Sequence, residues 1–568
     1  MLIVLITWLV AALITCVWGT AAYRLLGHSS RPTDQPTPAP EWLSAVGLSA
    51  LIAFLQLWSL AGPVGAARWP VALLTAIGAV VCRREIGSLA RRGWPAQWRA
   101  AEKWSAALLV VLLGWIVVYA SQRPMSFDVG LYTLQTLQWA EHFPAVPGLG
   151  NLHGRLAFNS SWFLPTALLR VSTPVGPAYG LSSYSLALLA VAAARAVGTG
   201  WRNPKAAGAG AWVPLLLLFL LLYVFQSRLS SALTDGPMTG LLALLLLHYA
   251  ALWRRYPAGL PPAEARAVVL LAVTLVTIKL SALPVVLLAL HAAWAIPEKR
   301  PRIGWWLSLG GVAAVLALPW VVRNAVLSGY LVYPLPALDV LTVDWKIPLT
   351  AAQAEQNLIV NLARNVPHAV AAATPQPHLR DWFANWWQLS FGYQQAILVA
   401  AALSVVAAAW RWRRGVPATE TGWAVGWIMA WLGTWFWLLV APDFRFGMGF
   451  MLTATLWPWA AAHWPWPSPR VRYAVAALLG LWVAQQMRDP LYHLRTTPRQ
   501  FATRVLWPEA APMPETEWLP ASPGTWVRVP RTGLQCYGAP LPCAMCAEAG
   551  LERRGPSLAN GFRRQRNH

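Results

Sequence analysis

Long apolar runs separated by short polar stretches make up most of the chain. Each run is roughly as long as the ~20 residues that cross a bilayer core as a helix. The pattern predicts an all-α polytopic membrane protein with about 12 to 14 transmembrane helices. The predicted spans are 1–21, 43–62, 67–82, 104–120, 178–197, 211–226, 237–253, 265–279, 281–297, 304–322, 393–410, 421–441, 446–464 and 471–487.

The polar connections sort by charge into two sets. Hydrophobic residues make up 57% of the chain and charged ones 11%, which excludes a soluble multidomain protein with charged linkers. The net charge of +23 does not indicate a nucleic-acid partner, because Arg and Lys gather in alternate short loops, where they fix orientation. These basic residues are Arg83, Arg84, Arg91, Arg92, Arg99, Lys103, Arg202, Lys205, Arg254, Arg255, Lys299, Arg300, Arg411, Arg413 and Arg414.

The positive-inside rule assigns the basic loops to the cytoplasm, so the other connections, 121–177, 227–236, 323–392 and 442–445, face outward. Long loops in compact proteins are usually functional. Those at 121–177 and 323–392 contain short helical stretches, VGLYTLQTLQWAEHF and LTAAQAEQNLIVNLARNV, which we expect to lie along the membrane surface. Function is therefore expected on the outer face.

The predicted bundle with its loops occupies residues 1–487, and a tail rich in Pro and Gly occupies 488–568. The tail follows an even number of spans from an outward N-terminus, so it should also lie outside. There a disulfide is permitted, and a Cys536–Cys543 bond would close the small loop QCYGAPLPC. The alternative is that Cys543 and Cys546, in CAMC, form a redox or metal pair, although no second CxxC accompanies it.

The first outer loop offers a candidate base. Asp128 precedes a short helix, along one face of which Tyr132 and Gln135 follow. A carboxylate just beyond a span is suited to take a proton from an acceptor hydroxyl. The alternative is that Asp128 caps the helix, as Asp often does. Glu141 is a second candidate, or simply a charge at the helix end.

The same loop continues as NLHGRLAFNSSWF, which supplies Asn151, His153, Arg155 and Asn159. Amides, hydroxyls and a guanidinium at close spacing could bind sugar hydroxyls and a phosphate, with Trp162 stacking on a sugar ring. The alternative is a re-entrant turn whose Asn and Ser satisfy backbone groups. No second ligand accompanies His153, so no metal centre is predicted.

Cations on the outer side are unusual under the positive-inside rule, so each of them is expected to have an anionic partner. Lys279 interrupts an apolar stretch, and an ionisable residue at membrane depth is a functional-site hypothesis. Arg and Lys there suit a lipid phosphate, or else they snorkel to headgroups. The further cations at outer span ends are Arg228, Arg323 and Arg445, and Asp443 could pair with Arg445. Asp235 is expected to be an ordinary turn residue. Trp345 and Lys346 in VDWKIP could close over the cavity or could simply lie at the surface.

Three stretches resemble an uncharacterised bacterial family of multi-pass membrane proteins. They are D-x-x-L-Y-x-L-Q from Asp128, P-G-L-x-N-L-x-x-R from Pro147 and F-N-S-S from Phe158, and the likeness continues through RNAVLSGYLVYP, VDWKIP, QCYGAPLPC and NGF. That family is similar to the C-type (GT-C) glycosyltransferases. The likeness implies a many-helix bundle, a catalytic Asp in the first long outer loop, and Arg445 as ligand of the donor phosphate. Val129 follows Asp128 where some such enzymes have Glu, so participation of a divalent cation, Mg²⁺ or Mn²⁺, stays open.

We therefore expect a glycosyltransferase in the bacterial cytoplasmic (inner) membrane, with its active face extracytoplasmic. It would move a sugar from a polyprenyl-phosphate-linked donor to a glycan or lipid acceptor; Asp128 would be catalytic, and Arg445 and Lys279 would stabilise the leaving phosphate. An O-antigen ligase or polymerase-like enzyme is the first alternative and would rely on outer arginines without an essential carboxylate. A lipid or solute transporter is the second, although its inverted repeats are not found in the sequence, and a non-catalytic scaffold is a third.

Overall fold

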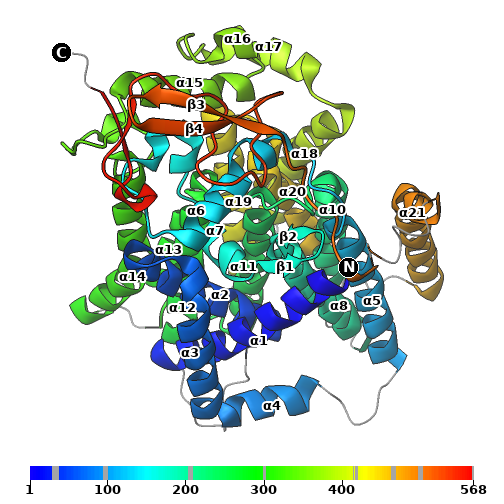
Figure 1. The fold of residues 1–568 in the computed structure, drawn as a ribbon. Helices are drawn as coiled ribbons and strands as arrows, with labels where there is room; N and C mark the ends of the chain where they lie inside the picture. The colour runs from blue at the N-terminus through cyan, green and yellow to red at the C-terminus, as the bar shows by residue number, and fades with distance from the viewer. Residues whose placement is uncertain are drawn as a thin grey trace.

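The computed structural model describes residues 1–27, 38–93, 100–202, 209–297, 302–413, 415, 420–461, 468–496, 503 and 505–565. Five of the basic loop residues named above lie outside these ranges: Arg99, Lys205, Lys299, Arg300 and Arg414. Figure 1 shows a helical bundle with loop helices and a β-rich tail gathered at one end.

The first half of the bundle contains α1 (Leu2–Leu25), α2 (Pro40–Ala61), α3 (Arg68–Val81), α4 (Arg83–Gly93), α5 (Ala100–Ala120), α6 (Leu134–His142), α7 (Phe163–Leu168), α8 (Tyr184–Arg202), α10 (Val213–Phe225), α11 (Asp235–Arg255) and α12 (Pro262–Ile278). The second half contains α13 (Val285–Trp294), α14 (Ile303–Ser328), α15 (Leu349–Ala363), α16 (His368–Ala371), α17 (Leu379–Leu389), α18 (Gly392–Trp412), α19 (Thr421–Val440), α20 (Phe444–Ala461) and α21 (Pro469–Thr496). A small hairpin, β1 (Val171–Thr173) and β2 (Gly176–Ala178), follows α7.

Within the described ranges, nine helices are long and apolar enough to cross a membrane. They confirm an all-α polytopic membrane protein. The other predicted spans also coincide with helices: α10, α12, α13, α20 and α21. The span at 281–297 is shorter than predicted, because α13 begins only at Val285, after Pro284, and ends at Trp294. At 1.5 Å per residue this helix is about half as long as a bilayer core.

Two glycines allow the first two helices to pack with their backbones in contact. A Cβ atom on Gly47 of α2 would lie 1.8 Å from the carbonyl oxygen of Thr15, and one on Gly19 of α1 would lie 1.9 Å from that of Leu43. Only a residue without a side chain fits such a contact, and small residues at helix interfaces are typical of membrane bundles. The helices α1 and α2 are therefore closely packed against each other.

The long loops and the tail meet at one end of the bundle, and the basic helix α4 lies at the other (Figure 1). The backbone N–H of Tyr537 donates to Gly130 O at 2.8 Å, and that of Phe562 donates to Pro147 O at 3.0 Å. These bonds tie the tail to loop 121–177. The predicted position of the tail on the same side as this loop is therefore observed, whichever face of the membrane this is.

The tail contains two antiparallel hairpins. Strand β3 (Thr516–Ser522) pairs with β4 (Thr525–Pro530), with an irregularity between Pro520 and Ser522, and β5 (Leu551–Arg553) pairs with β6 (Phe562–Arg564). The predicted disulfide joins Cys536 to Cys543, and Cys546 is free. The structure therefore contains the small closed loop and not a Cys543–Cys546 pair.

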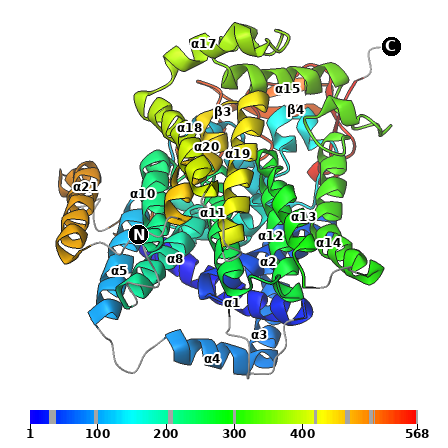
Figure 2. The same ribbon diagram turned by 180° about the vertical axis from the view of Figure 1, so that it is seen from behind.

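The second long loop forms a roof over the start of α20. Figure 2 shows α15 and α17 above α18, α19 and α20. Trp386 of α17 stacks on Phe444 with ring centroids 5.2 Å apart, and its Nε1–H donates to Pro442 O at 3.0 Å. Arg364, just after α15, donates to Leu439 O at 3.0 Å. The turn between α19 and α20 is thus held from above.

We expect Gly47→Ala to lower the free energy of unfolding by about 1–3 kcal/mol, because the added methyl group forces α1 and α2 apart. Thermal unfolding in detergent measures this. Gly310→Ala is the matched control, since a Cβ atom on Gly310 of α14 would meet nothing within 4 Å. Equal stability of the two variants would contradict the close packing of α1 and α2.

Candidate active site

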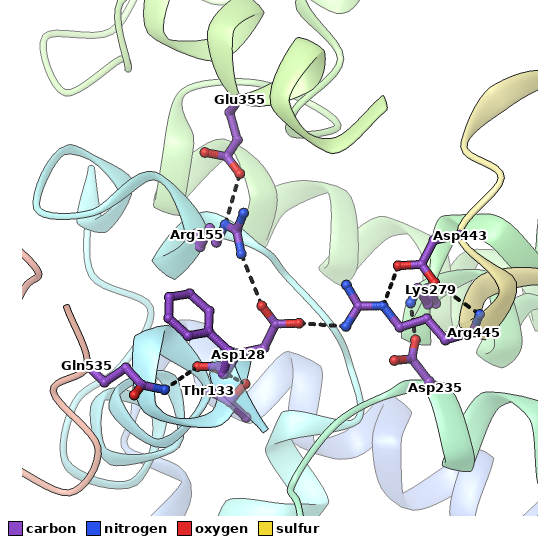
Figure 3. A network of polar contacts seen from close by, with 10 residues as sticks. Asp128, Thr133, Arg155, Asp235, Lys279, Glu355, Asp443, Arg445 and Gln535 are labelled. Carbon is purple, nitrogen blue, oxygen red and sulfur yellow. Dashed lines mark hydrogen bonds and ion pairs between the residues drawn. The ribbon is translucent and has the colours of Figure 1, made fainter. Parts of the chain in front are cut away.

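Asp128 lies between two guanidinium groups (Figure 3). Its Oδ1 accepts from Arg155 Nη1 at 3.1 Å, and its Oδ2 accepts from Arg445 Nη1 at 2.7 Å. The carboxylate makes no capping hydrogen bond to the following turn, so the capping interpretation is wrong. Asp128 instead joins the first loop to the start of α20, 317 positions further along the chain.

The turn that follows Asp128 is π-helical over Val129–Thr133 before α6 begins at Leu134. A π-turn holds an extra residue and is frequent at functional sites. The hydroxyl of Thr133 donates to the carbonyl oxygen of Asp128 at 3.1 Å. The predicted helix is therefore present, but it is widened where it carries the carboxylate.

Arg155 extends the network to the second long loop. Its Nε donates to Glu355 Oε1 of α15 at 3.1 Å. Burial raises the pKa of Glu355 above its usual value, against the opposite effect of Arg155. Sequence reasoning missed Glu355, although it is the only charged residue in the helix LTAAQAEQNLIVNLA. A single charge on an otherwise uncharged loop helix was the available signal.

Arg445 carries the network to the other side of Asp128. Its Nε donates to Asp443 Oδ2 at 2.8 Å, and its backbone N–H donates to Asp443 Oδ1 at 3.1 Å. The predicted pairing of Asp443 with Arg445 is confirmed. Asp443 holds the guanidinium from one side while Asp128 engages the other, so the group is fixed in direction.

Lys279 lies beside this cluster and pairs with Asp235 at the start of α11 (Figure 3). Its Nζ also lies 3.7 Å from the ring centroid of Phe446, the residue after Arg445. Asp235 is 3% exposed, so it is a buried counter-ion and not the ordinary turn residue expected from its Gly and Pro neighbours. The spatial proximity of Asp128, Lys279 and Arg445, predicted from separate segments, is thus observed.

The arrangement combines carboxylates that could accept a proton with cations that could bind an anion. Each of the three cations Arg155, Arg445 and Lys279 is in contact with at least one carboxylate. No group of three or more His, Cys, Asp or Glu side chains in the described part of the chain could hold a metal ion.

Tyr132 lies next to the network. Its ring contacts Phe158 edge to face at 5.6 Å, and Arg155 lies 6.0 Å from its centroid. Burial and the negative charge of Asp128 raise the pKa of its phenol, so the hydroxyl stays protonated at neutral pH. Tyr132 could therefore donate a hydrogen bond to a substrate.

Other predicted substrate ligands hold loops together instead. Gln135 donates to Tyr537 O at 3.0 Å and Ala539 O at 2.8 Å, and Asn151 donates to Trp345 O at 2.8 Å. These two side chains are buried and bind backbone, which replaces their predicted contact with sugar. Helix α6 is likewise covered by protein over most of its length, and its position along the membrane surface stays a prediction.

The segment VDWKIP also packs against protein. Trp345 donates from Nε1 to Ala325 O at 3.1 Å, and Arg554 of the tail lies 4.8 Å from its ring centroid. Lys346 pairs with Asp339 and donates to Leu341 O at 3.0 Å. Neither residue contacts the charged network, so their proposed closure over a cavity has no support in these contacts.

The FNSS segment satisfies backbone groups at the end of α12 and within α14. Asn159 donates to Trp320 O at 2.8 Å and accepts from Arg323, and Ser160 donates to Ile278 O at 2.8 Å. Trp162 is 0% exposed, so it belongs to the core and does not offer a stacking surface. The re-entrant-turn interpretation is favoured. Arg323 is buried, and its Nε has no hydrogen-bond partner in the described structure.

Two remaining residues have local roles. His153 accepts from the backbone N–H of Arg155 at 3.2 Å, and burial together with Arg155 lowers its pKa to about 4. Glu141 pairs with Arg170 at 2.7 Å and Arg68 at 3.4 Å, so it is a buried structural anion and not an exposed charge at a helix end. Neither residue contacts Asp128.

A family model described as a domain of unknown function, DUF8201, matches residues 1–452. The match includes every residue of the charged network, namely Asp128, Arg155, Asp235, Lys279, Glu355, Asp443 and Arg445. The tail beyond it carries the disulfide. No curated protein and no solved structure matches the chain.

We expect Lys279→Met to destabilise the protein by about 3–5 kcal/mol, because it leaves the buried Asp235 carboxylate without its counter-ion. The double variant Lys279→Met/Asp235→Asn should recover a large part of this loss. Thermal unfolding of the two single variants and the double variant measures the coupling. Purely additive effects would show that the two side chains do not interact.

His153 should make stability depend on pH. Its folded pKa of about 4 lies below the ordinary imidazole value of 6.5, so the unfolded chain binds the proton more readily. The contribution of neutral His153 to the free energy of unfolding is therefore fully present above pH 6.5. It is lost as the pH falls toward 4, by at most about 3 kcal/mol. Thermal unfolding at several pH values should therefore show a smaller loss between pH 7 and pH 4.5 in His153→Gln. If the stability of His153→Gln and of the wild-type protein depended on pH in the same way, this role of His153 would be contradicted.

Proposed function

Since the chain belongs to the DUF8201 family, whose description assigns no activity, we propose from the site itself that it is a membrane glycosyltransferase. It transfers a sugar from a polyprenyl-phosphate-linked donor to a hydroxyl of a glycan or lipid acceptor. The single observation that carries this proposal is the carboxylate of Asp128, held between Arg155 and Arg445 and next to Lys279. Proton acceptor and phosphate ligands are thereby available within one cluster.

The proposed reaction begins when the donor phosphate binds Arg445. Arg suits phosphate because its planar fork can donate two parallel hydrogen bonds. The phosphate then competes with Asp128 for the guanidinium and releases the Oδ2 atom of the carboxylate. A free carboxylate oxygen becomes available only after the donor has bound, which couples donor binding to activation of the acceptor.

In the transfer step, the acceptor oxygen forms a bond to the anomeric carbon while the bond from that carbon to the phosphate oxygen breaks. The acceptor proton passes to Asp128, and polyprenyl phosphate leaves with the bonding electron pair. Arg445 and Lys279 stabilise the negative charge that develops on the leaving oxygen. Tyr132, protonated beside Asp128, helps to orient the acceptor.

We place the site on the extracytoplasmic face of a bacterial cytoplasmic membrane. Three observations support this orientation: Arg83 and Arg84 of α4 lie at the opposite end of the bundle, Arg254 and Arg255 end α11 away from the site, and the tail holds a disulfide. Basic residues favour the cytoplasmic side, and disulfides persist outside the cytoplasm.

A ligase-like enzyme without an essential carboxylate is the second candidate. The convergence of Arg155 and Arg445 on one point favours it, because such an enzyme would use the two guanidinium groups alone. In that case Arg445→Gln would abolish activity, while Asp128→Asn would leave it unchanged.

Asp128→Asn should abolish transfer while the protein stays folded, because the amide cannot accept the proton. The measurement is the profile of lipid-linked sugars and surface glycan in a deletion strain complemented with each variant. We expect the donor lipid to accumulate with Asp128→Asn, as in the uncomplemented strain.

Asp381→Asn is the matched control, since Asp381 is an exposed carboxylate on α17 whose one ion pair among the described residues is with neighbouring Arg380. It should restore the wild-type profile. Full complementation by Asp128→Asn, at equal protein level, would refute the proposed base. An unchanged profile in the deletion strain itself would refute the transferase.

A further inference from the structure

The disulfide-closed loop of the tail lies directly against the turn that carries Asp128. Cys536 and Cys543 are buried, and the loop between them is anchored to β4: the N–H of Arg528 donates to Pro542 O at 3.0 Å, and that of Ala544 donates to Arg528 O at 3.1 Å. The loop is therefore held by a strand on one side and by a covalent bond across its base.

Hydrogen bonds from this loop fix the backbone on both sides of Asp128. Gln535 Nε2 donates to the carbonyl oxygen of Phe127 at 3.0 Å, and the N–H of Tyr537 donates to that of Gly130 at 2.8 Å (Figure 3 shows Gln535 beside this turn). In the reverse direction, Gln135 Nε2 donates to Tyr537 O and Ala539 O. Four hydrogen bonds thus join the loop to residues 127–135.

The fit depends on a glycine. A Cβ atom on Gly130 would lie 2.7 Å from Cζ of Tyr537, so the ring of Tyr537 rests on the bare backbone of the π-turn. A π-helical turn is rare and occurs mostly as a single widened turn inside an α-helix. Here the tail packs directly on that turn.

We propose that the Cys536–Cys543 loop is a positioning element of the active site, which directs the Asp128 carboxylate toward Arg155 and Arg445 only while the disulfide is intact. It acts through the backbone of residues 127–130 and touches no reacting atom. The catalytic role of the loop rests on the proposed function, whereas its effect on the position of Asp128 is independent of that function. A dithiol reductant would convert the disulfide to two thiols, become a cyclic disulfide itself, and release the turn.

Hydrogen exchange followed by mass spectrometry tests this on the full chain in detergent micelles. We expect amides of residues 129–137 to exchange at least about tenfold faster in Cys536→Ala/Cys543→Ala and in Gln135→Ala, because hydrogen bonds that hold the turn are lost. Cys546→Ala and Gln138→Ala are matched controls. Cys546 is not in the disulfide, and no side-chain hydrogen bond of Gln138 occurs in the described structure.

A second measurement separates positioning from general stabilisation. The coupling between Asp128 and Arg445, obtained from a thermal-unfolding cycle of Asp128→Asn and Arg445→Gln, should fall by at least half in the Gln135→Ala background and stay unchanged with Gln138→Ala. Gln135→Ala keeps the disulfide, so it remains informative if the double cysteine variant fails to fold.

Unchanged exchange and unchanged coupling in Gln135→Ala would overturn the proposal. Faster exchange with an unchanged coupling would also overturn it, because the loop would then stabilise the turn without directing Asp128. Neither measurement requires sugar transfer, so failure of the proposed function would leave both results intact.

Discussion

One row of alternating charges joins the two long loops to the start of α20: Glu355, Arg155, Asp128, Arg445 and Asp443. The five side chains come from three segments, namely loop 121–177, α15 and the turn at the start of α20, and each guanidinium is shared by two carboxylates. Removing either guanidinium leaves a carboxylate without its counter-ion in a partly buried place, where the energetic penalty is large. The loops are therefore positioned by electrostatics at the same point where chemistry is proposed.

Such a row contributes little net stability to the contact between loops, because desolvation of ion pairs offsets much of their attraction. Elsewhere in the same loops neutral side chains make several of the contacts: Asn151 and Gln135 bind carbonyl groups, and Asn159 donates to Trp320 O inside α14. Clusters of buried ionisable groups are frequent at functional sites. The row gathers five ionisable side chains in one place, which supports a functional reason for the charges around Asp128.

The sequence predicted the helices well because bilayer-length apolar runs leave few other structures for the backbone. It also predicted Asp128, Arg155, Lys279 and Arg445 as neighbours, since each is an unusual charge at an outer loop or span end. It missed Glu355 and misjudged Asp235, because their importance comes only from partners far away in the chain. Likewise, nothing local to Gln135 shows that the carbonyl groups it binds belong to the tail.

The tail adds a constraint that the bundle does not supply. The family match ends at residue 452, yet the tail contacts loop 121–177 through Tyr537 and loop 323–392 through Arg554, which pairs with Asp344 at 2.9 Å. It therefore bridges the two loops that contribute Asp128, Arg155 and Glu355. A bundle of helices fixes only the ends of such loops, and their interiors need a further support. Here the covalently closed loop and the two hairpins provide that support, so the geometry of the charged row depends on a segment that follows the last helix.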